Sequence, residues 1–336
     1  MKIHFGMKAA PLFFAQLKDR IEKFSQLGMD PIIELHLFGQ TDIFDRNGLK
    51  ICYKNCESIR SCHPKFIVHF PHQDISGKIF DPFVDGDHPV LKVYDFSNEI
   101  GATAVVIHRY CCLDRSFSFY EAEQFFNERL EYWAEEAKKR NLIVFVENCG
   151  FFWLPEHFTQ EYICSPLDHF FPWEIKRFNL FLETTNINNV FPIIDIAHAA
   201  LSINMLRLWH KFPKFRNDKR FSNITMAEVR ESLSLTIQDF IREAHPTYLH
   251  ISDSILFEEN GGFPKELDIY LKSEGLPLGD GNIDFGGIVR EVLSIQDDVI
   301  MILEIDPRDG NHNNNMAQVE GIEALKKILQ KFIPHG

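Results

Sequence analysis

The sequence lacks several features that would place it in a membrane or outside the cell. It has no apolar run of about 18 or more residues, so it predicts no membrane-spanning helix. Its start, MKIHFGMKAAP, does not have the basic segment and apolar stretch of a secretory signal. Its seven cysteines are an odd number and show no Cys-x-x-Cys spacing. We therefore expect reduced thiols and a cytoplasmic location.

Positive charge is also scarce. The chain has 35 Lys and Arg against 48 Asp and Glu, which gives a formal net charge of −13. Affinity for phosphate backbones comes mainly from Lys and Arg, so nucleic acid is disfavoured as a partner. The hydrophobic fraction of 45% and the charged fraction of 25% are typical of a globular protein. A small molecule is the favoured partner, and the oligomeric state stays open, a homo-oligomer included.

Short apolar runs alternate with longer amphipathic stretches along the chain. Continuous apolar runs are typical of strands that are buried on both faces of a parallel sheet. The amphipathic stretches predict helices over 12–28, 118–141, 224–245 and 315–332. The expected strands are 2–6, 31–37, 65–70, 102–108, 142–147, 191–195, 247–252 and 299–304.

Eight strands that alternate with helices predict an α/β fold, a (β/α)8 TIM barrel in which residues 1–336 form a single domain. A doubly wound open sheet is the alternative, and the sequence lacks the Gly-rich phosphate fingerprint that would favour it. Two connections, at about 151–190 and 253–282, are long. They follow the fifth and seventh strands on the face where barrels carry their sites, so we expect lids or binding loops there.

Ligand-type residues end most of the predicted strands. Because the carboxyl ends of barrel strands face one side, these side chains should converge. Carboxylates are rarely buried unless they are paired or bound to a metal, so the pattern predicts a divalent-metal site. The residues are His69, His108, Glu147, Asp195, His250 and Glu304, with His198 three positions after Asp195.

Four motifs give the chain a family resemblance over nearly its whole length. They are VENCG (146–150), DIAHA (195–199), LHISDS (249–254) and LGDGNIDF (278–285). The chain resembles the xylose-isomerase-like barrels, which include sugar isomerases and epimerases and the endonuclease IV-type enzymes of AP endonuclease family 2. The resemblance to the epimerases implies that Glu147, Asp195, His250 and Glu304 bind one divalent metal: Mn, Zn, Co, Mg or Fe.

The AP endonuclease branch implies a second metal. Its additional histidines match His69 and His108, and Glu147 would bridge the two ions. Where that branch has an Asp-Arg-His for a third metal, this chain has Ser273, Glu274 and Gly275. The resemblance therefore implies one or two metal ions per chain.

Five further residues are candidates for substrate contact. Glu34 and His36 share one face of the second strand by alternation. The others are His72, which follows His69 by three positions, Asp253, which follows His250 by three, and His198.

The resemblance favours a metal-dependent isomerase or epimerase that acts on a sugar or a related polyol ketone. Glu147 and Glu304 would take and return a proton next to the carbonyl group, and His198 would polarise the substrate oxygen. Two alternatives remain open at this point. One is an AP-endonuclease-like, metal-dependent phosphodiesterase, and the other is an iron-dependent oxidoreductase on the same barrel.

Overall fold

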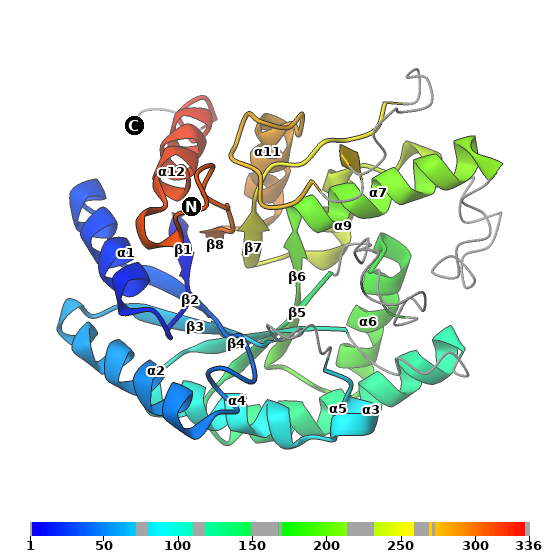
Figure 1. The fold of residues 1–336 in the computed structure, drawn as a ribbon. Helices are drawn as coiled ribbons and strands as arrows, with labels where there is room; N and C mark the ends of the chain where they lie inside the picture. The colour runs from blue at the N-terminus through cyan, green and yellow to red at the C-terminus, as the bar shows by residue number, and fades with distance from the viewer. Residues whose placement is uncertain are drawn as a thin grey trace.

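The strands of the protein close into a barrel. The computed structural model describes residues 2–71, 80–109, 118–148, 167, 170–213, 232–258, 269–270 and 273–332. Eight strands pair in chain order, all of them parallel, and β1 pairs with β8 to close the ring (Figure 1). The predicted single-domain (β/α)8 barrel is confirmed.

All eight predicted strands are present. β1 is longer at its carboxyl end than the sequence predicted, and it reaches Ala9. The bounds are β1 Lys2–Ala9, β2 Ile32–His36, β3 Lys65–His69, β4 Ala104–His108, β5 Ile143–Glu147, β6 Val190–Asp195, β7 Tyr248–Ile251 and β8 Asp298–Leu303.

Helices surround the barrel (Figure 1). None of the described helices is long and apolar enough to cross a membrane. The α-helices are α1 Phe14–Leu27, α2 Arg46–Ser58, α3 Pro82–Asp85, α4 His88–Ile100, α5 Phe119–Lys138, α6 Pro172–Thr184, α7 Ile196–Lys211, α9 Ile237–Ala244, α11 Phe285–Ile295 and α12 Met316–Leu329. The described residues also form short 3-10 helices: η1 Arg60–Cys62, η4 Ser232–Ser234 and η5 His312–Asn314.

Local chemistry sets several helix ends. Gly28 ends α1 with a left-handed φ of 63°, a conformation that glycine adopts without steric cost. Ser118 begins α5 in a capping box with Glu121. Asp284 caps α11 by accepting a hydrogen bond from the backbone of Gly287 at 3.0 Å.

Two predictions about helices need correction. The helix predicted over 224–245 is wrong at residues 232–236, because Thr236 and Asp239 form a capping box and the α-helix starts only at Ile237; residues 224–231 lie outside the described part. The predicted connection 151–190 contains α6, which begins at Pro172. Helix α7 was not predicted, because most of its residues are buried and it has no polar face to reveal its period.

Alternate residues of each strand pack in two different layers. Those that point outward, such as Ile33 and Leu35 of β2, pack against the helices. Those that point inward fill the lower barrel with a separate apolar cluster: Ile32, Ile67, Ala104, Val106, Phe145, Ile193, Tyr248 and Ile302. The rings of Phe145 and Tyr248 stack there with centroids 4.7 Å apart. Toward the carboxyl ends of the strands, the inward positions become polar.

Asp253 anchors the loop that follows β7. Its Oδ2 accepts hydrogen bonds from the backbone of Gly279 at 2.8 Å and of Gly281 at 3.1 Å, and its Oδ1 accepts from Ser254 at 2.8 Å and Ile283 at 3.3 Å. The backbone of Gly281 comes so close that a Cβ atom there would lie 2.1 Å from the carbonyl oxygen of Ser254. The LGDGNIDF motif is thus a tightly packed loop.

This packing predicts that Gly281→Ala destabilises the protein by about 1–3 kcal/mol, because the added methyl group meets backbone atoms that cannot move independently. Urea or thermal unfolding measures the change. Gly286→Ala is the matched control. It lies inside α11, where the nearest atom is a side-chain oxygen of Asp284 at 3.2 Å, and the helix should gain up to about 1 kcal/mol. Equal stability of the two variants would contradict the prediction.

Candidate metal centre

Strand register brings the polar residues to one level of the barrel. Residues paired in register lie side by side and point to the same face. Three such pairs occur at the carboxyl ends of the strands: His36 with His69, His108 with Glu147, and Asp195 with His250. They form a ring of imidazoles and carboxylates above the apolar cluster.

The carboxylate of Glu147 lies at the centre of this ring and has no exposed surface. Its Oε2 is 3.0 Å from Nε2 of His69 and 3.1 Å from Nε2 of His108. Its Oε1 is 3.0 Å from Nδ1 of His250 and 3.2 Å from Nδ1 of His198. Burial by itself raises the pKa of Glu147, but His250 and His108 outweigh it and hold that pKa well below its usual value. Glu147 is therefore an ionised carboxylate in a buried site.

The four residues predicted to hold the first metal come together. Potential ligand atoms of Glu147, Asp195, His250 and Glu304 all lie within 4.8 Å of one another. Nδ1 of His250 is 3.0 Å from Oε2 of Glu304 and 3.9 Å from Oδ2 of Asp195.

Two observations show that this donor set fits a cation. Oε2 of Glu304 is buried and accepts no hydrogen bond among the described residues, since the nearby Nδ1 of His250 is hydrogen-bonded to Oε1 of Glu147 instead. Burial, helped by Glu147 and Glu304 and opposed by His198, raises the pKa of Asp195 to about 7. Three carboxylates and one imidazole that crowd together in this way are a ligand set that Zn²⁺, Mn²⁺, Co²⁺ or Fe²⁺ accepts.

The second predicted pair of histidines faces the same glutamate. Ligand atoms of His69, His108 and Glu147 lie within 4.8 Å of one another. Nδ1 of His69 donates to the carbonyl oxygen of Phe70 at 3.0 Å, and its Nε2 lies 3.3 Å from Nε2 of His108. Burial lowers the pKa of His108, although Glu147 opposes that shift. These two imidazoles and the carboxylate form a second candidate ligand group that shares Glu147 with the first.

His198 lies in the first turn of α7, beside both groups. Its backbone donates to Oδ1 of Asp195 at 2.7 Å, and its Nδ1 donates to the carbonyl oxygen of Asn148 at 2.8 Å. Its Nε2 is 3.2 Å from Oε2 of Glu274. Neither Asn148 nor Glu274 was predicted from the sequence to be a site residue. Their signals were the VENCG motif and the position of Glu274 where the AP endonuclease branch carries a metal-binding motif.

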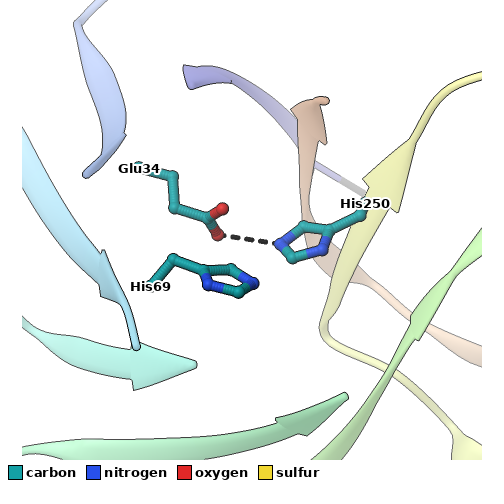
Figure 2. A group of neighbouring side chains, drawn as sticks. All are labelled: Glu34, His69 and His250. Carbon is teal, nitrogen blue, oxygen red and sulfur yellow. Dashed lines mark hydrogen bonds and ion pairs between the residues drawn. The ribbon is translucent and has the colours of Figure 1, made fainter. Parts of the chain in front are cut away.

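The remaining predicted site residues differ in their positions. Glu34 is fully buried, and Figure 2 shows its carboxylate directed at His250 across the barrel interior, above His69. The side chain of His36 is 22% exposed, and its Nδ1 lies 3.7 Å from Oε1 of Glu304.

Two of the predicted substrate contacts are not brought to this ring by the described structure. His72 lies outside the described residues. Both oxygens of Asp253 accept backbone hydrogen bonds in its own loop. A contact between either residue and a substrate stays a prediction.

The closed barrel and its ring of imidazoles and carboxylates define a (β/α)8 protein with a candidate metal centre at its strand ends. Comparison by sequence gives the family: the profile described as "Xylose isomerase-like TIM barrel" matches residues 90–328. The chain belongs to this family, as the motifs indicated. None of the curated proteins matches the chain in sequence.

Solved structures of similar fold include sugar epimerases. A D-tagatose 3-epimerase-like protein is 16% identical, with a TM-score of 0.58, and the match covers 98% of this chain and 97% of that one. The apo form of 3-keto-D-glucoside 4-epimerase, YcjR, from E. coli is 12% identical, with a TM-score of 0.54 and coverage of 97% and 100%. The IOLI protein with a bound zinc atom is 14% identical, with a TM-score of 0.51 and coverage of 98% and 99%. At these identities the likeness is one of fold.

The protonation of the ligand groups predicts that cation binding releases protons. Burial alone would lower the pKa of His250, but the carboxylates of Glu34, Glu147 and Glu304 outweigh burial and raise this pKa well above its usual value. Without a cation, the ring of His250 is therefore protonated at neutral pH. Ligand groups must lose their protons to bind. Affinity for Zn²⁺ or Mn²⁺ should therefore rise with pH, and part of this rise should occur near pH 7, because the pKa of Asp195 is raised to about 7. Calorimetry in two buffers of different ionisation enthalpy counts the protons, and binding without proton release would contradict this assignment.

Proposed function

We propose that the protein is a metal-dependent isomerase or epimerase that acts on a sugar or a related polyol ketone. The observation that carries this proposal is the group Glu147, Asp195, His250 and Glu304, which lies at the carboxyl ends of β5 to β8. Barrel enzymes carry their chemistry at this face. The family of the chain and the epimerases among the similar structures support the choice of substrate class.

A divalent cation in this group would chelate adjacent carbonyl and hydroxyl oxygens and stabilise the negative charge that develops when a proton leaves the neighbouring carbon. Glu304 is the ligand open to the mouth of the barrel, with a side chain that is 20% exposed, whereas Glu147 is fully buried. We assign proton transfer to these two carboxylates, one on each side of the bound carbon. His198, held by Asn148 and Asp195, would donate a hydrogen bond to a substrate oxygen.

This assignment predicts exchange of the hydrogen next to the substrate carbonyl. The cation-loaded protein, incubated in D₂O with a panel of ketoses and 3-keto sugars, should replace that hydrogen with deuterium, as followed by proton NMR. Glu304→Gln should slow the exchange by about 10²–10⁴-fold, because the amide cannot accept the proton. The comparison is made at saturating cation, after the cation affinity of each variant has been measured.

Glu22→Gln is the matched control, since its side chain on α1 is 58% exposed and, within the described part of the chain, it forms an ion pair with Lys18 far from the strand ends. It should exchange at the wild-type rate. No exchange with any member of the panel, from protein shown to hold its cation, would contradict the proposed activity.

A metal-dependent phosphodiesterase is the second candidate, and one observation favours it. His69 and His108 both approach Oε2 of Glu147, so two cations could share that carboxylate and clamp the attacking and leaving oxygens of a phosphodiester. The net charge of −13 weighs against nucleic acid as its substrate.

The number of cations separates the two candidates. If the second group binds, elemental analysis should give two cations per chain, and His108→Ala should lower this to one because the four-residue group keeps all its ligands. His4→Ala is the control, since His4 pairs with Asp298 at the opposite end of the barrel and is 44% exposed. Two cations together with hydrolysis of bis(p-nitrophenyl) phosphate or abasic-site DNA would favour the phosphodiesterase. If the protein binds a single cation and His108→Ala does not change this number, the isomerase is the candidate that remains.

A further inference from the structure

Glu34 is a buried carboxylate in contact with three side chains that can donate hydrogen bonds. It lies on β2, inside the barrel and across from β7, and has no exposed surface. Its Oε1 lies 2.6 Å from Nε2 of His36. Its Oε2 lies 2.8 Å from Nε2 of His250 and accepts from the hydroxyl group of Tyr248. An ionised carboxylate has no proton to donate, and it can satisfy all three of these neighbours by accepting from each.

The contact with His250 decides which nitrogen of that ring faces the ligand group. Because Oε2 of Glu34 can only accept, Nε2 of His250 must carry a proton. The other nitrogen, Nδ1, is the one that lies 3.0 Å from both Glu147 and Glu304 (Figure 2 shows the Glu34 contact). Glu34 and the ligand carboxylates thus hold opposite ends of the same imidazole.

We propose that Glu34 is a positioning residue that keeps His250 protonated on Nε2, so that Nδ1 is the nitrogen presented to the cation. This inference rests on the cation group of the proposed function and goes beyond it. A carboxylate that accepts from the far nitrogen of a ligating histidine fixes the ring and makes it a stronger ligand. Tyr248 supports Glu34 in turn, because it shares β7 with His250 two residues away and its hydroxyl group reaches the same oxygen.

The contacts of Glu34 and His250 with their neighbours favour a positioning role for Glu34 over direct binding of a cation by its carboxylate. Ligand atoms of Glu34, His69 and His250 do lie within 4.8 Å of one another. However, Nδ1 of His69 contacts the carbonyl oxygen of Phe70, and its Nε2 faces Glu147 in the second candidate ligand group, so neither nitrogen is directed at Glu34. Oε2 of Glu34 is also occupied by the Tyr248 hydroxyl group. Direct binding would require His250 to lose its Nε2 proton, and this is an outcome that an experiment can detect.

The first test measures affinity for Co²⁺ and the visible spectrum of the Co²⁺ protein. Glu34→Gln keeps the size of the side chain but removes the charge that strengthens His250 as a ligand. It should weaken Co²⁺ binding by about 10–100-fold and shift the absorption bands of the bound ion. Glu22→Gln is the matched control and should change neither quantity. Wild-type affinity together with a wild-type spectrum in Glu34→Gln would overturn the proposal.

The second test needs no variant at the site and so does not depend on whether Glu34→Gln folds. Proton–nitrogen NMR of the ¹⁵N-histidine-labelled wild-type protein with Zn²⁺ reads both nitrogens of His250. We expect a proton on Nε2 and a metal-bound Nδ1. A metal-bound Nε2, or a proton on Nδ1 in the Zn²⁺ form, would overturn the proposal. Failure of the wild-type protein to bind Co²⁺ or Zn²⁺ at all would instead refute the metal centre of the proposed function, so the two failures are distinguishable.

Discussion

The contact of one buried carboxylate with four imidazoles governs the upper half of this barrel. Glu147 touches histidines that come from β3, β4, β7 and the start of α7. Burying an isolated charge at this depth would cost more free energy than the net stability of a folded domain. A buried carboxylate therefore persists only with partners of opposite charge or with a cation. The partners are supplied by elements that are distant in sequence. The closed barrel is therefore a condition for the site, since it alone brings these elements together.

The apolar cluster below the ring strengthens these interactions. The barrel just under the polar level is filled by apolar side chains without charged or polar groups, such as Ile32, Ile67 and Phe145. Electrostatic interactions are stronger where water is excluded, and the same exclusion makes an unpaired group costly. This explains why both oxygens of Glu34 meet groups that can donate, whereas the buried oxygen of Glu304, nearer the mouth, has no hydrogen bond among the described residues. This oxygen without a hydrogen bond belongs to the group of residues that fits a cation.

The sequence predicted the parts of this structure that depend on local pattern. Apolar runs identified all eight strands, and the polar residues at the ends of the third to eighth runs identified the ring, because the register of a closed parallel barrel brings these positions to one level. Alternation also placed Glu34 and His36 on the same face of their strand. Helix α7 escaped because a helix that is buried on nearly all sides has no amphipathic period. Tyr248 escaped because nothing in the sequence of β7 shows that its hydroxyl group meets a glutamate of β2, a contact that only closure creates.

The shared position of Glu147 links the two ligand groups. One of its oxygens faces His250 and His198, and the other faces His69 and His108. A cation on either side would withdraw the negative charge that stabilises the imidazoles on the other side, and would hold the carboxylate in one orientation for both. If both groups bind a cation, their affinities would therefore be coupled through a single side chain, and the second group would require the histidines that end β3 and β4 in this chain.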